Sequence, residues 1–375
     1  MSEYSPGLTI DLTAVVDNWC ALARVCAPAV TSAVVKADAY GLGVGRVSEA
    51  LFAAGCRHFF VATLDEAQEL FSCVGSDISC YVLGGAPSGR ELECARINAM
   101  PVLSSLSAIR RWREALAQEG VSWAPCGLKF DTGMSRQGVS LSQLDELLQE
   151  RHLLQGLNPQ LIMSHLACAD EPVHPLNKTQ LDEFKSRAPK LRAMLPDCKL
   201  SLANSCGIFL GADYHLDLVR PGAALYGYQP PTALRGTIAD VVTLSLPVLQ
   251  IKRLEIDSAV GYGATITKAK GSILAICAGG YADGLHNIMQ SKGCGAWHGQ
   301  EVPVVGRISM DATIFDLSAV PGIETCLDSV SLPAVEVINK DLSFSRLTQE
   351  RGLLGYELLT SLRGGRYKRH YQEVK

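Results

Sequence analysis

One lysine, Lys36, stands where the sequence could support covalent chemistry with a small molecule. It ends the apolar run Ala33-Val34-Val35 and precedes a turn with Tyr40 and several glycines. The run is typical of a strand buried on both faces. Burial lowers the pKa of a lysine and makes its amine nucleophilic, which Schiff-base chemistry with an aldehyde requires. The same string also fits a lysine that reaches solvent from a strand end, so the rest of the chain must decide.

Other polar side chains stand at or just after the ends of predicted strands. They are Arg136, His165, Ser205 and Arg220. Reactive residues of a (β/α)8 barrel lie at the carboxyl ends of its strands, so these residues and Lys36 would converge on one mouth. Singly, each fits a structural role, such as a loop cap, an interior histidine or an ion-pair partner. Five polar residues at successive strand ends of one face would rarely occur by chance.

This set of side chains describes a site for pyridoxal phosphate (PLP). Lys36 would hold the aldehyde, while Ser205, Asn204 and the backbone at Pro221-Gly222 would receive the phosphate. Arg220 would face the ring nitrogen. A guanidinium there leaves the nitrogen unprotonated and the ring a weaker electron sink than a carboxylate would. Such a site suits proton exchange without transamination.

The elements that must position these residues alternate between strands and helices. Strands are predicted at 33–36, 58–63, 78–84, 99–104, 126–131, 160–165, 199–205 and 216–220, after an opening strand at 8–12. Helices are predicted after the opening strand and at 45–54, 65–73, 89–97, 106–119, 141–150 and 177–195. Eight strands alternating with helices indicate an α/β fold with an N-terminal (β/α)8 TIM-like barrel. A doubly wound open sheet is the alternative.

A second, mostly β domain is predicted after the Pro230-Pro231 break. Short apolar runs with glycine turns follow the break, with one helical stretch at 343–362. The predicted limits are 8–229 for the PLP-binding barrel and 230–375 for the C-terminal β domain, on which residues 1–7 could pack. The absence of a low-complexity linker indicates that the domains pack together.

Composition narrows the class of protein. With 375 residues, 47% of them apolar and 19% charged, and a net charge of -4, the chain fits an ordinary soluble protein, with no sign of nucleic-acid or membrane partners. The first residues do not read as a signal peptide, so a cytoplasmic location is expected. The 13 cysteines include no C-x-x-C pair, which argues against a metal site or disulfide framework.

Nine motifs along the chain extend this interpretation. In order, they are A-V-V-K-A-D-A-Y-G-L-G, K-F-D-T-G-M-S-R, M-S-H-L-A, A-N-S, V-R-P-G-A-A-L-Y-G, G-Y-G-A-T, G-G-Y-A-D-G, G-R-I-S-M-D and G-Y-E-L-L-T-S-L. Their order and combination resemble bacterial alanine racemases over nearly the whole chain. The resemblance implies a PLP-dependent racemase of fold type III, an amino-acid substrate and a head-to-tail homodimer with shared active sites.

The resemblance also implies roles for individual residues. Lys36 would carry the cofactor and act as the base on the D-alanine side, and Tyr262 of the other subunit would act on the L-alanine side. Inversion through a planar carbanion needs acid/base groups on both faces, and a phenol needs cationic neighbours to become a useful base. His165, hydrogen-bonded to Tyr262 and Arg220, would link the phenol to a cation.

Further positions match cofactor, substrate and entrance residues of the family. Phosphate contacts are implied for Tyr40, Ser205, Gly222 and Tyr356; substrate contacts for Arg136, Met310 and Asp311; an entrance residue at Tyr281; and a carbamylated lysine in some members at Lys129. The departures are Leu42 in place of a common histidine, Ser135-Arg136-Gln137 in place of the commoner G-R-L, and Gly364-Gly365 near the end. They bear on the geometry at Arg136 and the entrance.

Three functions stay open on the sequence. Interconversion of L- and D-alanine, supplying D-alanine for peptidoglycan, is the expected one, and alanine catabolism fits the same residues. A racemase of broader specificity is the second, and a PLP-binding protein without turnover is the third. The presence of both Lys36 and Tyr262 favours catalysis over binding alone.

Overall fold

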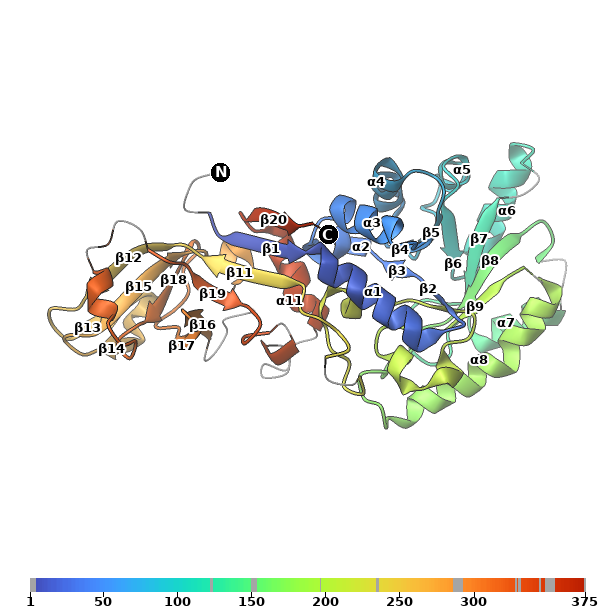
Figure 1. Cartoon of the computed structure of the whole chain (residues 1–375). Helices are drawn as coiled ribbons and strands as arrows, with labels where there is room; N and C mark the ends of the chain where they lie inside the picture. The colour runs from blue at the N-terminus through green and yellow to red at the C-terminus, as the bar shows by residue number, and fades with distance from the viewer. Residues whose placement is uncertain are drawn as a thin grey trace.

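The computed structural model describes residues 5–121, 124–149, 154–195, 197–233, 236–285, 293–327, 329, 332–343, 345–347 and 355–373. The described chain forms a barrel of parallel strands with outer helices and, beside it, a mostly β part (Figure 1). The barrel strands are β2 (Val30–Thr31), β3 (Ala33–Val34), β4 (His58–Val61), β5 (Ser79–Val82), β6 (Met100–Leu103), β7 (Pro125–Lys129), β8 (Asn158–Met163), β9 (Lys199–Ser201) and β10 (Leu218–Val219).

Helix α1 (Leu12–Cys26) precedes β2, and helices follow most of the later barrel strands. They are α2 (Lys36–Gly41), α3 (Val44–Ala53), α4 (Leu64–Val74), α5 (Glu91–Arg96), α6 (Leu106–Gln118), α7 (Leu141–Gln149) and α8 (Pro175–Met194). Short 3-10 turns, η2 (Gly207–Leu210), η3 (Ala212–Tyr214) and η4 (Ala223–Tyr226), surround β10. Side-chain caps begin several helices: Asp11 accepts from Ala14 N, and Thr63 accepts from Glu66 N. Such caps satisfy backbone donors that the first helical turn leaves unpaired.

The strands close into the predicted barrel. β3 to β9 form one parallel sheet in chain order, and β10 pairs with β2. On its other side, Asp217 N donates to Leu200 O at 3.1 Å, and Arg220 N donates to Ala203 O at 3.0 Å. Because β10 is bonded on both sides, the sheet has no open edge there, which excludes the doubly wound alternative. The TIM-like fold predicted from the sequence is confirmed.

The mostly β part contains three sheets. Its strands are β1 (Gly7–Asp11), β11 (Val242–Leu246), β12 (Val248–Arg253), β13 (Ser258–Val260), β14 (Ile266–Lys268), β15 (Ile273–Ala278), β16 (Cys294–Trp297), β17 (Gln300–Pro303), β18 (Ala312–Asp316), β19 (Val335–Ile338) and β20 (Lys368–Gln372). Its helical pieces are η5 (Tyr262–Ala264), η6 (Tyr281–Asp283), η7 (Ile323–Cys326), α11 (Gly355–Ser361) and η8 (Leu362–Gly364). The sheet orders are β17-β16-β19-β11-β1-β20, β12-β15-β18 and β13-β14.

The two ends of the chain meet in the largest of these sheets. β1 pairs antiparallel with β11 and parallel with β20, so the chain starts beside the carboxyl-terminal strands before it enters the barrel. Residues 1–4 lie outside the described residues, as does much of the predicted helix at 343–362, of which α11 is described. The predicted division near residue 229 stays a prediction.

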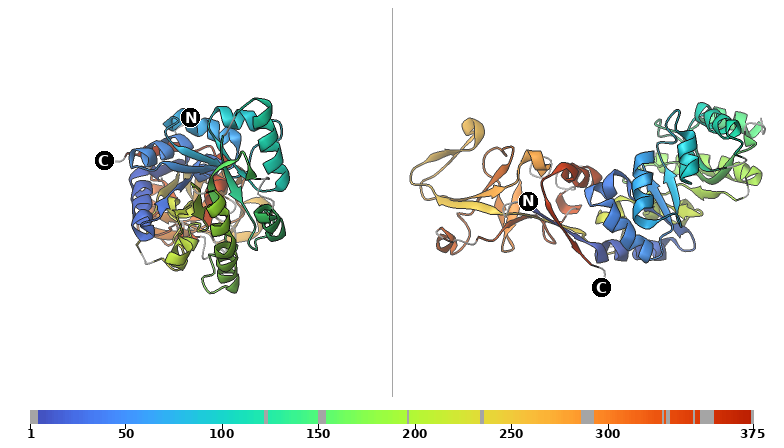
Figure 2. Two further views of the ribbon diagram at one scale, coloured as in Figure 1. Left: turned by 90° about the vertical axis from the view of Figure 1, so that its right-hand side faces the viewer. Right: turned by 90° about the horizontal axis from the view of Figure 1, so that it is seen from above.

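The barrel and the β part share their main hydrophobic core, and a small separate cluster of buried residues lies within the β part. A single cluster of buried side chains runs from Leu8 and Ile10 through the barrel to Leu358 and Leu359. Seen from above, the amino-terminal strand runs between the two parts (Figure 2). This continuity indicates that the parts are packed together. Among the described residues, no helix is long and apolar enough to cross a membrane.

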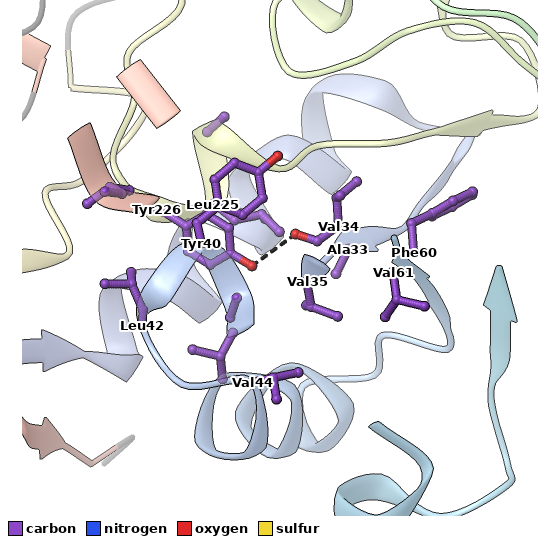
Figure 3. Close-up of a cluster of buried hydrophobic side chains, with 14 of the residues drawn as sticks. Ala33, Val34, Val35, Tyr40, Leu42, Val44, Phe60, Val61, Leu225 and Tyr226 are labelled. Atoms are coloured by element: carbon purple, nitrogen blue, oxygen red, sulfur yellow. Dashed lines mark hydrogen bonds between the residues drawn. The ribbon is translucent and has the colours of Figure 1, made fainter. Parts of the chain in front are cut away.

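Part of this core lies directly beneath the end of β3. Tyr40 and Tyr226 have ring centroids 4.9 Å apart, and the Tyr226 hydroxyl donates to Val34 O at 3.0 Å (Figure 3). Leu42, one of the departures from the family pattern, is fully buried there. The strand that precedes Lys36 is therefore fixed by packing and by a side-chain hydrogen bond.

His58, at the start of β4, is an ionisable group inside the barrel wall. Its ring stacks on Tyr81 with centroids 6.2 Å apart, and its Nδ1 is buried without a partner among the described residues. Burial, with a smaller contribution from Lys199, lowers the pKa of His58 from 6.5 to about 4. The folded protein therefore holds this imidazole neutral across the mildly acidic range.

We predict that His58 makes the protein less stable as the pH falls from 6.5 towards 4. The unfolded chain binds a proton in this window and the folded chain does not, so up to about 3 kcal/mol of unfolding free energy is lost. His58→Phe should remove this component. Urea unfolding of both proteins over a pH series measures the difference, in which carboxylate titration common to both cancels. Parallel pH profiles would contradict the prediction.

Candidate functional site

Lys36 lies at the carboxyl end of β3, as predicted. The strand before it is buried, and Val35 N donates to Phe60 O of the neighbouring strand at 2.9 Å. Burial lowers the pKa of Lys36 from 10.5, the positive charge of Arg136 lowers it further, and Glu66 opposes the shift. A lysine with a lowered pKa is more often neutral, and a neutral amine is the nucleophile that attacks an aldehyde.

The chain directly after Lys36 makes a left-handed turn. Residues 37–40 all have positive φ, between 51° and 58°, although none is glycine. The sequence indicates a turn formed by glycines, but the reversal begins before Gly41. Left-handed backbone costs roughly 1–2 kcal/mol per residue with a Cβ. The surrounding structure must therefore stabilise this turn.

Glu66 supplies part of that support from the next strand–helix unit. Its carboxylate accepts from Ala37 N at 2.9 Å and from Ala62 N at 2.6 Å. The same carboxylate is the acidic group that acts on Lys36. Sequence reasoning missed Glu66. Its position in the first turn of a helix that follows a barrel strand was the signal that could have revealed it.

Tyr40, Ser205, Gly222 and Tyr356 come together beside this turn. Ser205 is buried, and its Oγ accepts from Gly222 N at 3.0 Å and from Ala224 N at 3.2 Å. A Cβ added at Gly222 would collide with the Tyr40 hydroxyl. Tyr356 contributes to the raised pKa of Tyr40, which places the two phenols near each other. The Tyr40 phenol and the Ser205 hydroxyl thus lie against the backbone of Gly222, and Tyr356 lies near Tyr40.

Arg220 is a buried cation at the same mouth, with 3% of its surface exposed. Its terminal nitrogens donate to Ser201 Oγ, to Ser164 O at 2.7 Å and to Leu202 O at 3.2 Å. His165 Nδ1 lies 3.4 Å from the same guanidinium. All these partners are neutral, and Arg220 Nε has no hydrogen-bond partner among the described residues. Burial lowers the pKa of Arg220 to about 9, which leaves it protonated at neutral pH.

The charge of Arg220 shapes the basicity of its neighbours. Burial lowers the pKa of His165 well below 6.5, and Arg220, Lys129 and Arg136 lower it further. Lys129 is 6% exposed, and its pKa falls to about 8 through burial and the charges of Arg136 and Arg220. These mutual effects place Arg136, Lys129 and His165 in one electrostatic cluster with Lys36. His165 is neutral, so its Nδ1 can accept from Arg220 while Nε2 carries the proton.

Asn204 holds the loop beside this cluster. Its side-chain oxygen accepts from Gly207 N at 2.9 Å at the start of η2, and its backbone bridges to Arg220. The side-chain oxygen of Asn204 therefore has a hydrogen-bond partner within its own loop. The predicted contact of Asn204 with a cofactor stays a prediction.

The remaining predicted site residues lie in the mostly β part of the molecule. Tyr262 is 73% exposed, and it lies in η5 between β13 and β14, away from the barrel (Figure 1). Met310, Asp311 and Tyr281 are also exposed. Tyr281 N donates to Ser309 O at 3.0 Å, which joins the entrance loop to the turn that carries Met310. Within one chain, these residues are not brought together with Lys36.

Tyr262 lines a surface pocket of about 360 Å³. The pocket is lined by Gly261, Tyr262, Ile276, Arg307, Ser309, Ala312 and Ile314. A Cβ at Gly263 would lie 3.5 Å from the Arg307 guanidinium, so this cation is beside the tyrosine turn. Sequence reasoning did not assign Arg307, although it belongs to the motif that contains Met310 and Asp311.

Comparison with known families covers both parts of the chain. Residues 10–230 match the family model described as alanine racemase, N-terminal domain, and residues 241–371 match that of the alanine racemase C-terminal domain. The alanine racemase of Rhodospirillum rubrum is 43% identical over 98% of this chain and 96% of its own length. A catabolic alanine racemase of Agrobacterium fabrum is 42% identical over 97% of this chain and 91% of its own length.

Solved structures agree with the sequence relatives. The alanine racemase of Bartonella henselae, determined with covalently bound pyridoxal phosphate, superposes with a TM-score of 0.89 at 36% identity, covering 98% of this chain and 99% of that one. The biosynthetic alanine racemase of Pseudomonas aeruginosa gives a TM-score of 0.85 at 28% identity over 98% and 99% of the two chains. The chain thus belongs to the alanine racemase family, a family of PLP-dependent isomerases.

Proposed function

We propose that this protein interconverts L- and D-alanine with PLP by a two-base mechanism in a homodimer. The observation that carries the proposal is the placement of Lys36, with its lowered pKa, at the barrel mouth where Arg220 is buried among neutral acceptors. The names of the relatives support alanine as substrate, and the Bartonella henselae structure supports the cofactor.

The residues at the mouth fit PLP. Lys36 would hold the cofactor covalently, while Tyr40, Ser205, Gly222 and Tyr356 would contact the phosphate. The close approach of the Tyr40 hydroxyl to Gly222 leaves no room for a Cβ, as expected where backbone borders a phosphate. Ser205 accepts from Gly222 N, so a phosphate would compete for that donor while the serine O–H remains free to donate.

Arg220 would set the electronic character of the site. When bound, PLP withdraws electrons and stabilises negative charge at the substrate α-carbon. Arg220 has a free Nε donor that could meet the ring nitrogen, and a guanidinium holds its proton far more strongly than a carboxylic acid. It would therefore leave that nitrogen unprotonated and limit charge withdrawal. This restraint favours return of a proton to the α-carbon over transamination.

Two proton-transfer groups would flank the α-carbon. The Lys36 amine would serve one face, and the Tyr262 phenol of a second copy would serve the other. In the neutral tautomer described for His165, Nδ1 accepts from Arg220 and Nε2–H is free to donate to the Tyr262 oxygen. Such a donor stabilises the phenolate, which is the form that can accept a proton. His165 and Arg220 would thereby make Tyr262 a competent base.

We infer a dimer because Tyr262 and Lys36 lie apart within one chain. Tyr262 is exposed and far from its own barrel in sequence and fold, so it can reach a cofactor only in another copy. Tyr281, Met310 and Asp311, exposed in the same part of the chain, would arrive with it. A head-to-tail pair would cover these side chains and complete two identical sites.

Substrate binding would draw on both copies. Arg136 of one and the Met310-Asp311 turn of the other would meet the carboxylate, and Tyr281 would narrow the entrance. Lys129 would take up CO2 as a carbamate with release of a proton, because a pKa of about 8 leaves a minor but usable fraction of the amine neutral near physiological pH. The carbamate would offset the positive charge of Arg136, which acts on Lys129.

For the biological role, we propose D-alanine supply for peptidoglycan in the cytoplasm. The catabolic relative of Agrobacterium fabrum, at 42% identity, makes alanine breakdown the second candidate. Both roles use the same reaction, so the site residues serve either one.

The reaction is tested by incubating the PLP-loaded protein with L-alanine and following enantiomers by chiral chromatography. We expect racemisation of alanine, with serine, lysine and arginine as comparison substrates. Preference for a larger amino acid would instead indicate the broader-specificity racemase. PLP binding without any turnover would support the binding protein.

Shared sites predict complementation between two inactive variants. Lys36→Ala should lose the visible absorbance of lysine-bound PLP, while Tyr262→Phe should retain PLP but racemise poorly. Random reassociation of an equal mixture gives hybrids with one intact site, so activity should recover to about one quarter of wild type. The controls are each variant dissociated and reassociated alone. Absence of recovery despite mass-spectrometric detection of hybrids would contradict the shared site.

Gly222→Ala should weaken PLP binding by about 5-fold to 150-fold, because overpacking against Tyr40 typically costs about 1–3 kcal/mol. Gly222 has φ of -129°, so the effect is not backbone strain from a positive φ. Absorbance titration of the cofactor-free protein measures the dissociation constant. Gly364→Ala is the matched control, because its Cβ would meet nothing within 4 Å. Equal affinities for both variants would remove Gly222 from the phosphate cradle.

A further inference from the structure

The left-handed turn after Lys36 is held from the carboxyl-terminal strand as well as from the barrel. On the barrel side, Ala37 N donates to Glu66, and Val44 N donates to Asp38 Oδ1 at 2.8 Å. Asp38 is the second residue of the turn, with φ of 58°. Its other carboxylate oxygen faces the β part of the molecule, where a cation meets it.

That cation is Arg369 of β20. Its NH1 lies 3.3 Å from Asp38 Oδ2, and its NH2 donates to Gly41 O at 3.0 Å. One guanidinium thus contacts both the middle and the end of the turn. Next to it, the Tyr371 hydroxyl donates to Leu42 O at 3.0 Å. Asp38 and Arg369 keep 19% and 29% of their side-chain surface exposed, so water screens the pair only partly.

β20, which carries Arg369 and Tyr371, is held in place by strand pairing. It pairs in parallel with β1 over its whole length, from Gly7 opposite Lys368 to Asp11 opposite Gln372. The neighbouring α11 and η8 also restrict the turn, because a Cβ at Gly41 would lie 3.0 Å from Leu359 O. The turn is thus confined between the barrel and the carboxyl-terminal strand.

We propose that Arg369 is a positioning residue of the cofactor site: by binding Asp38 and Gly41 O, it holds the left-handed turn that sets Lys36 and Tyr40 before the cofactor binds. The proposal rests on the proposed function, because it takes Lys36 and Tyr40 as PLP contacts. Arg369 itself acts only through the turn. The carboxyl-terminal part would then contribute to the site in its own barrel as well as to that of a second copy.

Arg369→Gln tests the proposal with two measurements that do not depend on turnover. Amide hydrogen exchange of peptides covering residues 36–44, in the cofactor-free protein, should become faster by about ten-fold or more, and the dissociation constant for PLP should rise by a similar factor. At saturating PLP, kcat should recover towards wild type, because the cofactor itself helps to fix the turn. A residue that only joins the two parts would lower the melting temperature without these local changes.

Glu373→Gln is the matched control. Glu373 joins the carboxyl-terminal segment to the barrel through an exposed ion pair with Arg46 at 2.5 Å, and no contact with residues 37–41 is described for it. Its substitution leaves in place the Arg46 guanidinium, which lies 5.3 Å from the ring centroid of Tyr371. We expect wild-type exchange and PLP affinity for this variant. Arg369→Lys keeps a charge but not the two-point contact, and should lie between wild type and Arg369→Gln. It serves as the test if Arg369→Gln does not fold.

Asp38→Asn completes a double-mutant cycle. Asparagine tolerates left-handed backbone and can still accept from Val44 N, so it removes mainly the charge that Arg369 binds. The double variant should be less impaired than the sum of the single variants predicts. Wild-type hydrogen exchange and wild-type PLP affinity in both Arg369→Gln and Arg369→Lys would overturn the proposal. Failure of the wild-type protein to bind PLP would instead overturn the proposed function, and the exchange measurement would still decide whether Arg369 holds the turn.

Discussion

The buried guanidinium of Arg220 is the constraint on which the site depends. A cation with 3% exposure needs several acceptors, and here Ser201, Ser164, Leu202 and His165 supply them. These acceptors come from the ends of β8 and β9 and the residues that follow, and Arg220 follows β10. These strands are parallel neighbours, so their carboxyl ends lie side by side at one rim of the barrel. The fold therefore creates a place where positive charge is held by dipoles rather than by a carboxylate.

This charge determines which neighbours can exchange protons. Burial is the main cause of the lowered pKa of His165, and the Arg220 charge adds to it, so this imidazole is neutral. Burial, Arg136 and Arg220 together lower the pKa of Lys129 to about 8. The pKa of Lys36 is also lowered, in part by the neighbouring positive charge. Because cations gather at the mouth, it favours bound anions such as phosphate and carboxylate groups. Lys36 is the group at this mouth to which we assign one proton-transfer role. The second candidate, Tyr262, is displayed on a remote surface, and this separation is the physical reason for proposing that catalysis requires two copies.

Much of this arrangement could be predicted from the sequence because it depends on strand ends. Apolar runs followed by a polar residue correctly placed Lys36, His165 and Arg220 at one mouth. The backbone after Lys36 could not be predicted in the same way. Local preference indicates a glycine turn, whereas the observed turn begins at Ala37 in a conformation that local interactions disfavour.

Its supports, Glu66 and Arg369, lie in other elements, and the contact between Asp38 and Arg369 joins residues 331 positions apart. Neither hydrophobic periodicity nor a short motif can predict that Asp38 and Arg369 are in contact, because neither side chain changes the hydrophobic pattern of its own strand or helix. The pairing of β20 with β1 is similarly remote, since it joins the two ends of the chain. These features become visible only when the whole fold is present.

The strained turn also explains why the site needs the end of the chain. Residues 37–40 cost free energy in this conformation, and local hydrogen bonds such as Ala39 N to Val35 O do not remove the clash of each Cβ. Part of the compensation comes from Glu66 of the barrel and part from Arg369 of β20. Since β20 is the last described strand and pairs with the first, its contacts form only when both termini are in place. A barrel without that strand would retain Lys36 in sequence but lack the constraint that orients it.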